Sequence, residues 1–396
     1  MRIFLVVVYY MPSTKSSAKI MYDLGQELLK KGHDVSIITI SENLTTPLEV
    51  VIEDGLRILR VKSGKIDGAN KYIRFINELF LSQLIWYRGN KFFKEFKCDL
   101  VVWYSPSIFF SRLISKIKGI NNCPSYLILR DIFPQWALDT GLLKNGVIYK
   151  ILQYFEFQQY KVANVIGVQS PKNLDYFDKL NVQLNSKLEV LYNWVDLKKT
   201  CIQKTNFRDT LNLNEKIVFF YGGNIGVAQD MDNIIRLAYN LRYEKKAHFL
   251  IVGEGSESTR LKKMILSLGL ENVNIFGSVG QDKYLAMLSE FDIGLISLNK
   301  SFKTPNFPGK MLGYMYFSKP ILASINTGND LQTLLEEHNA GLVSINGDDN
   351  QFIENSLKLI SEQEFRINMG NNGKKVLNDF FSVTNASQQI LANFID

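Results

Sequence analysis

The sequence has few cysteines and histidines, and their scarcity excludes two kinds of protein. Its 396 residues contain three cysteines, an odd number spread far apart along the chain (Cys98, Cys123 and Cys201). A disulfide framework is therefore not expected, and a reducing compartment is. The three histidines form no cluster with the cysteines, so we expect no zinc site.

Long apolar runs and a cleavable leader are also missing. Met1-Arg2 leads directly into the letters IFLVVVYY, which predict a buried strand rather than a signal peptide. No uncharged apolar run approaches the ~20 residues that a membrane-spanning helix needs. We therefore expect a cytoplasmic protein that is at most peripheral to a membrane.

The charge is unbalanced toward lysine and arginine, with a formal net charge of +7. A surplus of this size suits nucleic acid, anionic lipid or a phosphorylated ligand, and it does not choose among them. The basic residues are scattered and no nucleic-acid-binding module can be recognised, so we expect no nucleic-acid partner.

Strand-like runs alternate with amphipathic helical stretches in two series. The first series is RIFLVVVYY, HDVSIITI, DLVVWYS, SYLILRD, NVIGVQS and LEVLYN, and the second is KIVFFYGGNIG, AHFLIVGEG, NVNIFGSVG, DIGLISL and KPILASI. This alternation predicts an α/β protein with two doubly wound, Rossmann-like domains, each built on a parallel sheet. Such sheets bind ligands at the carboxyl ends of their strands, so we expect a cleft between the two domains.

The predicted boundaries follow from the two series. We assign residues 1–195 to an N-terminal, acceptor-binding domain and the polar stretch 196–214 to a linker. Residues 215–375 are assigned to the C-terminal domain, and 376–396 to a helix that packs back on the N-terminal domain.

Residues 71–97 differ from the rest of the first half. Lysine, arginine and aromatic side chains lie beside an apolar stripe in this stretch. The pattern fits an interfacial helix lying on anionic lipid. It fits equally well a solvated helix whose apolar face packs in the core.

Glycine turns follow three strands of the second series and are the first candidates for a binding site. They contain Gly222, Gly223, Asn224 and Gly226; Gly253, Glu254 and Gly255; and Phe276 and Gly277. Glycine lets backbone N–H groups approach a phosphate closely, and three such turns fit a nucleotide-sized ligand. Tight turns need glycine anyway, so the turns also have a purely structural interpretation.

The stretch FKTPNFPGKMLGYM places a lysine at the start of a helix. Pro308 and Gly309 predict a turn, and Lys310 enters the first helical turn. A cation is unfavourable there unless an anion lies between the helix N-terminus and the ammonium group. We therefore predict that Pro308, Gly309 and Lys310 bind a diphosphate. The alternative is an exposed surface lysine.

The order of these elements resembles GT-B glycosyltransferases of family 4 over nearly the whole chain. The resemblance is carried by LGQELLKKGHDVSIIT, by VLYNWVD with its Asn193 and Asp196, and by the segment from IVGEGSESTRL to FDIGLISL. RDIFPQWALDTGLL resembles a segment found in the O-antigen and capsule branch, whose members act in the synthesis of lipopolysaccharide and capsule. Within that branch, NFPGKMLGYM and ASINTGNDL are most similar to N-acetyl-L-fucosaminyl (L-fucosamine) transferases.

The resemblance implies a retaining transferase that moves a sugar from a UDP-sugar to a polyprenyl-diphosphate-linked oligosaccharide. It further implies peripheral attachment to the inner face of the cell membrane, with 71–97 as the candidate lipid contact, and no metal. Asp131 and Lys310 are the catalytic candidates, and Asp330 joins the donor-binding set. The acceptor-binding candidates are Ser16, Ser17, Arg130, Asp131 and Asp139.

Several positions depart from the family pattern. Typical members carry a Glu-x7-Glu pair that holds the donor, and the matching positions here are Pro305 and Gly313. The usual arginine and lysine after the first glycine turn are replaced by Asn224 and Gln229, and Ser16-Ser17 replaces a Gly-Gly pair. These losses keep a second interpretation open, a non-catalytic GT-B scaffold or partner protein. A nucleotide-sugar epimerase is a further alternative.

Overall fold

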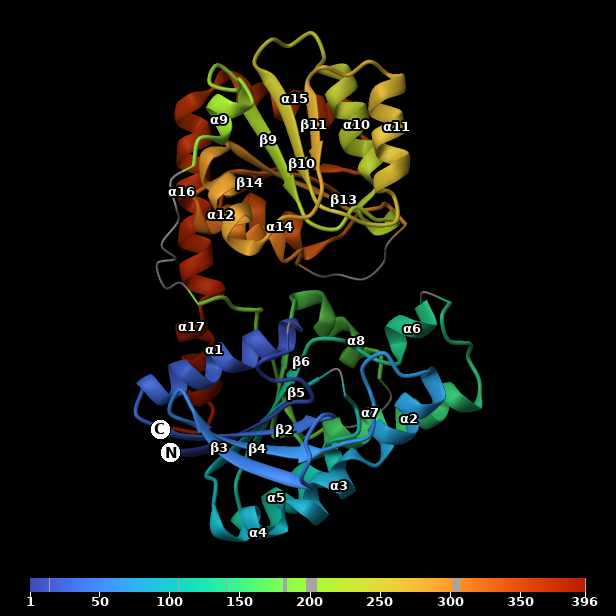
Figure 1. Ribbon diagram of the computed structural model, residues 1–396, viewed down its shortest axis with the longest axis vertical. Helices are drawn as coiled ribbons and strands as arrows, with labels where there is room; N and C mark the ends of the chain where they lie inside the picture. Colours follow the sequence, from blue (N-terminus) through green and yellow to red (C-terminus); the bar gives the residue numbers. More distant parts are fainter. Residues whose placement is uncertain are drawn as a thin grey trace. The chain divides into compact units, whose positions relative to one another are not determined.

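The computed structural model describes residues 1–13, 15–105, 107–139, 141–180, 184–196, 205–301 and 307–395. The chain forms two compact units (Figure 1). Unit 1 comprises Met1–Asp196 and Ser382–Asp396, and unit 2 comprises Leu197–Phe381.

Unit 1 is built on a twisted sheet whose strands are parallel except at one edge. In the described residues the strand order is β3-β4-β2-β1-β5-β6-β7-β8, and only the pairing of β3 with β4 is antiparallel. The strands are β1 (Arg2–Val6), β2 (Asp34–Ser41), β3 (Leu48–Glu53), β4 (Leu56–Lys62), β5 (Leu100–Tyr104), β6 (Ser125–Leu129), β7 (Val165–Val168) and β8 (Lys187–Val190).

Helices cover both faces of this sheet, because its central strands are apolar on both sides. In β1, Ile3 and Leu5 enter one core while Phe4 and Val6 enter the other, the period of two that a strand requires. The helices are α1 (Ser16–Lys30), α2 (Lys71–Leu79), α3 (Leu81–Arg88), α4 (Asn90–Glu95), α5 (Ser111–Asn121), α6 (Gln135–Asp139), α7 (Val147–Val162), the 3₁₀ turn η1 (Pro171–Asn173), α8 (Leu174–Asp178) and α17 (Val383–Leu391).

Unit 2 repeats the design with a smaller sheet. Over the described residues its order is β11-β10-β9-β12-β13-β14, with parallel pairing throughout. The strands are β9 (Ile217–Gly222), β10 (Ala247–Val252), β11 (Val273–Phe276), β12 (Ile293–Ser297), β13 (Ile321–Ile325) and β14 (Gly341–Ile345). The carboxyl ends of β9, β10 and β11 therefore meet at one edge, and this edge carries the three glycine turns.

Helices also lie on both faces of the second sheet. They are α9 (Phe207–Thr210), the 3₁₀ turn η2 (Val227–Gln229), α10 (Met231–Asn240), α11 (Ser258–Ser267), α12 (Gln281–Glu290), α13 (Lys310–Tyr316), α14 (Asp330–Glu337), α15 (Asp349–Ser361) and α16 (Gln363–Phe380). The α/β class and the two parallel-sheet, Rossmann-like domains expected from the sequence are thus confirmed.

The strand pattern located eleven of these strands and missed three. The edge hairpin of β3 and β4, and the last strand β14, were not expected. An Asp-Gly turn joins β3 to β4, with positive φ at Asp54 and Gly55. That dipeptide between two β-branched runs is a standard hairpin signal, so the hairpin was readable in the sequence.

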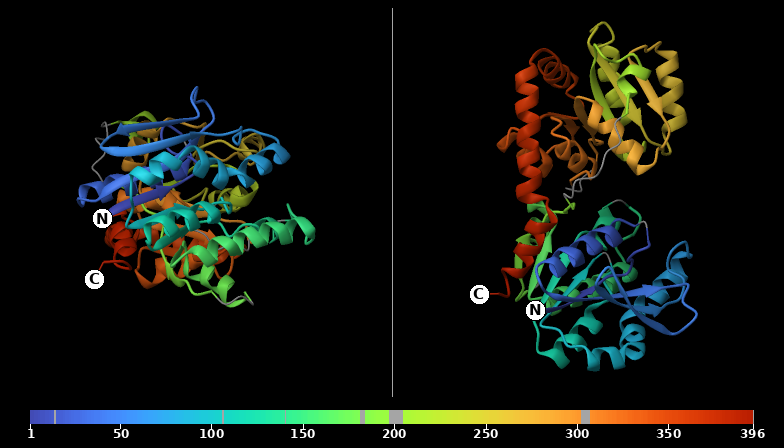
Figure 2. Two further views of the ribbon diagram at one scale, coloured as in Figure 1. Left: turned by 90° about the horizontal axis from the view of Figure 1, so that it is seen from below. Right: turned by 60° about the vertical axis from the view of Figure 1, so that its left-hand side comes forward.

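The end of the chain belongs to unit 1, but the boundary expected at residue 375 lies inside a helix. Helix α16 continues to Phe380, and the return to unit 1 begins at Ser382. Ser382 caps α17 by accepting a hydrogen bond from the Asn385 N–H. Figure 2 shows the two termini close together on unit 1. The expected linker, 196–214, overlaps α9, and residues 197–204 lie outside the described residues.

The stretch 71–97 is not one helix. It forms α2, α3 and α4, with breaks at Phe80 and Gly89. Leu81, Ile85 and Phe93 are fully buried in the core of unit 1, so α3 and α4 are ordinary core helices. Helix α2 keeps most of the exposed apolar side chains of this stretch, and Tyr87 of α3 is exposed as well. No helix in the described part of the chain is both long and apolar enough to cross a bilayer.

The packing of α17 predicts how much unit 1 depends on the chain's end. Ile390 is fully buried in the same core cluster as Leu24 of α1. We expect Ile390→Ala to lower the free energy of unfolding of unit 1 by about 2–5 kcal/mol, because it leaves a cavity in that core. Urea denaturation followed by tryptophan fluorescence measures this change.

Ile395→Ala is the matched control, because Ile395 is 47% exposed. It should leave the free energy of unfolding within about 0.5 kcal/mol of the wild-type value. Equal effects of the two substitutions would contradict the packing described for α17.

Candidate functional site

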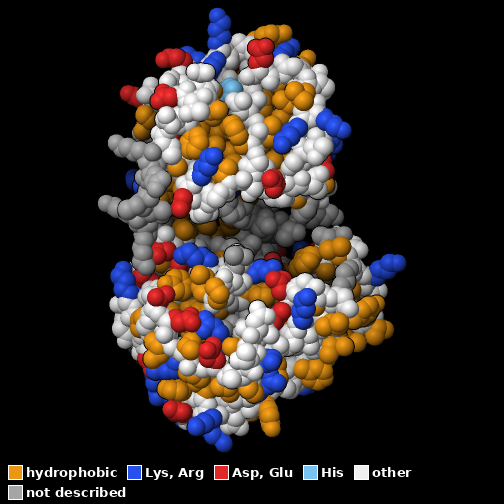
Figure 3. Space-filling model, in the orientation of Figure 1, with side chains coloured by type: hydrophobic (Ala, Val, Ile, Leu, Met, Phe, Trp, Pro, Cys, Tyr) orange, Lys and Arg blue, Asp and Glu red, His pale blue; other side chains and the backbone are white. Residues whose placement is uncertain are grey.

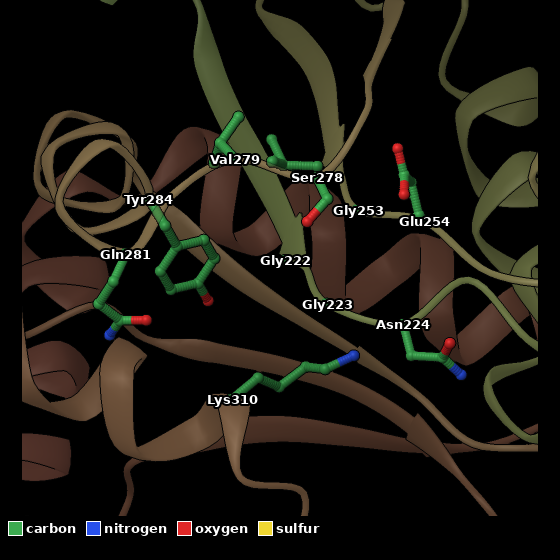
Figure 4. A pocket seen from close by; sticks show the side chains of 11 residues that line it. Gly222, Gly223, Asn224, Gly253, Glu254, Ser278, Val279, Gln281, Tyr284 and Lys310 are labelled. Atoms are coloured by element: carbon green, nitrogen blue, oxygen red, sulfur yellow. The ribbon is translucent and has the colours of Figure 1, made fainter. Parts of the chain in front are cut away.

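A cavity of about 510 Å³ lies at the carboxyl ends of β9, β10 and β11 in unit 2. Its size is typical of a small-molecule site. Its lining contains six of the residues singled out in the sequence as donor-binding: Gly222, Gly223, Asn224, Gly253, Glu254 and Lys310. Figure 4 shows these residues around the cavity.

Two of the glycine turns touch each other through their backbones. A Cβ atom on Gly253 would lie 1.8 Å from the Gly223 carbonyl oxygen, and one on Gly255 would lie 2.2 Å from the Ile225 carbonyl oxygen. Gly253 also has a φ of +156°, a conformation that side chains rarely adopt. Packing alone explains Gly253 and Gly255, because no larger residue fits at either position.

Gly223 is different, since its open side faces the cavity. Its φ is +136°, and the nearest atom to an added Cβ would be Cε of Lys310, 3.5 Å away. The Gly223 N–H donates to the Val252 carbonyl, and the Ile225 N–H donates to the Glu254 carbonyl. These bonds hold the turn against the next strand, so its backbone is presented to the cavity without a covering side chain.

Lys310 is the cation of this cavity. It is the first residue of α13, as the sequence predicted, and Gly309 is the N-cap. Its side chain runs beneath Gly222 and Gly223, with the ammonium group pointing toward the turn (Figure 4). The Nζ atom lies 3.6 Å from the centroid of the Tyr221 ring, a cation–π contact. The alternative of an exposed surface lysine is wrong, because the side chain is partly buried.

Burial alone sets the protonation of this lysine. It lowers the pKa of Lys310 to about 7, and no carboxylate of the described residues offsets the loss of water. A bound anion would offset this loss of hydration, because a nearby negative charge favours the charged form of a lysine.

Five lining residues were not expected from the sequence. They are Val252, Ser278, Val279, Gln281 and Tyr284. Gln281 and Tyr284 are three positions apart on α12 and so face the same side. The Tyr284 ring fills the space beside Gly222, where an added Cβ would approach its Cε2 atom to 2.3 Å. Burial raises the pKa of Tyr284 to about 12, so its hydroxyl remains a neutral hydrogen-bonding group.

Seven other donor candidates lie outside the lining of this cavity: Gly226, Gly255, Phe276, Gly277, Pro308, Gly309 and Asp330. Phe276 and Gly277 end β11 just before Ser278, and an added Cβ on Gly277 would lie 3.2 Å from the Glu254 carboxylate. Asp330 is buried at the start of α14. The cap of that helix is Asn329, whose side chain accepts from the Leu331 N–H.

Gly313, Asn224 and Gln229, three of the positions that depart from the family pattern, belong to unit 2. Gly313 is inside α13, and an added Cβ there would meet Leu288 at 3.1 Å. Pro305 lies outside the described residues. Gln229 and Asn224 bond to each other, with Asn224 Nδ2 donating to Gln229 Oε1 at 2.9 Å. The polar pair that replaces the usual cations therefore carries no charge.

The acceptor candidates lie in unit 1, and Arg130 is the most deeply placed. It follows β6 and is 6% exposed. Its guanidinium donates to the carbonyl oxygens of Leu191 and Tyr192 and lies 5.2 Å from the Trp194 ring centroid. Burial lowers the pKa of Arg130. Its Nε has no partner among the described atoms. Arg130 thus ties the end of β6 to the segment after β8.

The remaining acceptor candidates are closer to the surface. Asp131 is exposed directly after Arg130, and Asp139 ends α6, where it accepts from Gln135 Nε2 at 2.7 Å. Ser16 and Ser17 begin α1, the first exposed and the second buried. The four residues therefore lie in three separate segments of unit 1: the start of α1, the loop after β6 and the end of α6.

The burial of Lys310 predicts a cost to stability that removal of the charge should relieve. The pKa of Lys310 is about 7 in the folded protein against 10.5 for an ordinary lysine. Burial of the charged lysine therefore lowers the free energy of unfolding by its full amount below pH 7. This loss of stability decreases as the pH rises from 7 toward 10.5. We expect Lys310→Met to raise the melting temperature by about 2–4 °C at pH 6.5. The gain should shrink toward pH 10.

Differential scanning calorimetry across this pH range measures the effect. Lys283→Met is the control, because Lys283 is an exposed lysine on the neighbouring helix α12. A pH-independent loss of stability in Lys310→Met would show that the lysine is structural.

Sequence comparisons give weak but consistent similarities. Residues 203–376 match the family model of glycosyl transferases group 1. The probable glycosyltransferase WbjE of Pseudomonas aeruginosa is 26% identical over 219 residues, which is 54% of each chain. The putative colanic acid biosynthesis glycosyl transferase WcaI of Escherichia coli is 23% identical over 78% of this chain and 80% of its own. The first match spans about half the length of its relative.

Structural comparisons extend to the whole fold. Sucrose-phosphate synthase from Thermosynechococcus elongatus has a TM-score of 0.72 at 15% identity, covering 99% of this chain and 98% of its own. The Anabaena protein HepE, solved in complex with UDP, has a TM-score of 0.68 at 14% identity and covers 99% of both chains. Similarity at this identity shows the fold alone. The chain therefore has the GT-B fold, and its residues 203–376 match the group 1 glycosyltransferase family model.

Proposed function

We propose that this protein is a retaining glycosyltransferase that moves a sugar from a UDP-sugar to a lipid-linked oligosaccharide. The observation that carries the proposal is the Lys310 ammonium group, which faces the open Gly223 turn with no carboxylate beside it in the described residues. A nucleoside diphosphate supplies the missing anion. The cavity that holds this lysine has the volume of a small-molecule site.

Glu254 is the candidate partner of the ribose. It is the one carboxylate in the lining of the described cavity. A carboxylate accepts two hydrogen bonds from a diol, which is the contact that the missing acid at Gly313 would otherwise make. The Tyr284 and Gln281 side chains of α12, together with the Ser278-Val279 turn, then form the wall for the base.

The chemistry needs charge stabilisation at the leaving group. In the transfer, the bond from the anomeric carbon to the β-phosphate oxygen breaks, and a bond from the same carbon to an acceptor oxygen forms. The acceptor proton passes to the departing phosphate, which leaves on the face that the acceptor attacks. Lys310 neutralises the charge that develops on the diphosphate, and preorganised donors of this kind are among the largest contributions to catalysis.

The acceptor side of the proposal rests on unit 1 and on the relatives. Asp131, exposed at the end of β6, would orient the acceptor hydroxyl, and the buried Arg130 would hold that strand end in place. WcaI is described as a colanic acid biosynthesis enzyme, which supports a surface polysaccharide as the product. N-acetyl-L-fucosamine is the first donor sugar to test, and O-antigen or capsule assembly at the inner face of the cell membrane is the proposed setting.

Calorimetric titration with UDP, GDP and NAD tests the donor site. We expect selective UDP binding that takes up about one proton per UDP at pH 8, because a bound diphosphate recharges a lysine whose pKa is about 7. The affinity should therefore fall roughly tenfold per pH unit above pH 8. Lys310→Met should lose this proton uptake and bind about tenfold or more weakly.

Titrations in two buffers of different ionisation enthalpy measure the proton count. Lys283→Met should bind like the wild type. Absence of binding to all three nucleotides would overturn the donor site. A non-catalytic scaffold, which the replacement of the family acid by Gly313 favours, would then be the better account.

Glu254→Gln tests the ribose contact. The substitution keeps the shape but weakens two charge-assisted hydrogen bonds, so UDP affinity should fall about tenfold while uracil affinity stays unchanged. Glu257→Gln is the control, since Glu257 pairs with Arg260 Nε at 2.7 Å instead of lining the cavity. Unchanged UDP affinity in Glu254→Gln would exclude this role.

A further inference from the structure

Unit 1 carries an apolar surface that its own packing leaves uncovered. On α2, the exposed apolar side chains are Tyr72, Ile73, Phe75, Ile76 and, at its end, Phe80. On the turn before α7 and along that helix they are Leu142, Val147, Ile148, Ile151 and Tyr154. Tyr72 is 83% exposed and Val147 75%. We call these ten side chains the α2–α7 surface.

The two halves of this surface share one foundation. The Phe109 ring lies 5.9 Å from Phe75 of α2 and 5.1 Å from Phe155 of α7, both in edge-on contacts. Phe109, Ile108 and Leu152 form a small buried cluster, and Leu79 and Leu143 pack against it. The inner faces of both helices therefore rest on one cluster. Figure 3 shows orange side chains gathered over the region that Figure 1 labels α2 and α7.

The exposed charges in the α7 half of this surface are basic, and Asp67, the exposed acid nearest the α2 half along the chain, pairs with Lys15 at 3.1 Å. Lys144 and Lys150 are exposed within and beside the α7 half, and residues 141–155 contain no acid. In the α2 half, Glu78 pairs with Arg74 at 2.7 Å, and the glutamate side chain is only 15% exposed while the arginine is 54% exposed. The nearest exposed acid along the chain is Asp139 of α6, outside the apolar side chains.

We propose that the α2–α7 surface docks on an anionic phospholipid bilayer, with its aliphatic and aromatic side chains entering the headgroup boundary. Exposed apolar patches of this extent mark interaction sites. A surrounding of lysine and arginine matches negative headgroups, and tyrosine is a residue that bilayer interfaces favour. The surface combines two helices and the turn between α6 and α7, so it is not the single amphipathic segment 71–97 that the sequence suggested.

This inference deepens the proposed function and rests on it for the lipid-linked acceptor. The docking surface itself is argued from side chains of unit 1 alone. It lies in unit 1, whereas the nucleotide cavity lies in unit 2. Lipid binding and UDP binding can therefore be measured separately on the same full-length variants.

The test is co-sedimentation of the full chain with vesicles of phosphatidylcholine, alone or with a third phosphatidylglycerol. We expect binding to the anionic vesicles at 0.1 M salt and weaker binding at 0.5 M salt or without phosphatidylglycerol. The double variant Ile76→Asp, Ile148→Asp should bind at least about tenfold more weakly. The same loss is expected of Lys144→Ser with Lys150→Ser, which leaves the apolar side chains in place.

Leu266→Asp is the matched control, since Leu266 is an apolar side chain of unit 2 that is 81% exposed. It should sediment with vesicles like the wild type. UDP affinity should be unchanged in every variant, so failure of lipid binding and failure of the donor site give different results.

Three outcomes would overturn the proposal. The first is a wild type that stays in the supernatant with anionic vesicles, and the second is a double variant that sediments like the wild type. The third is a wild-type dimer in analytical ultracentrifugation that Ile148→Asp dissociates, because a second copy of the chain would then cover the surface.

Discussion

The contact between the Gly223 carbonyl and the Gly253 backbone is the constraint on which the cavity of unit 2 depends. The turn after β10 packs so closely on the turn after β9 that Gly253 cannot carry a side chain at the point of contact. This packing leaves a stretch of bare backbone at the sheet edge, and Lys310 can lie beneath it because the first turn is open on that side. A larger residue at position 253 would push the two turns apart and so displace the backbone that lines the cavity.

The position of Lys310 in the unit 2 cavity comes at the expense of stability, because burial disfavours its charged form. The ammonium group has exchanged water for the face of Tyr221 and has gained no carboxylate in the described structure. A carboxylate partner would have stabilised the empty protein and then competed with any anionic ligand. In the described residues the ammonium group thus has the Tyr221 ring beside it and no negative charge, and an anion in the cavity would stabilise its charged form.

The sequence predicted what is local and missed what depends on distant contacts. The glycine turns and the helix start at Lys310 were readable because each is set by a few adjacent residues. The role of Tyr284 was not readable, since it arises from the packing of α12 against Gly222 across 62 positions. Arg130 was expected from the sequence only as a candidate for acceptor binding. Its carbonyl partner at Leu191, 61 residues away, buries it.

The chain leaves unit 1 after Asp196 and returns at Ser382, and Ser382 is paired with Val195 in an isolated β-bridge. The point of exit and the point of entry are thus hydrogen-bonded neighbours, with the Val383 N–H donating to the Val195 carbonyl. In topological terms, unit 2 is an insertion into a single surface position of unit 1. A protein made of residues 1–196 joined to 382–396 by a short loop would therefore contain the whole core of unit 1. A chain truncated after Asp196 would lack the part of that core that α17 supplies.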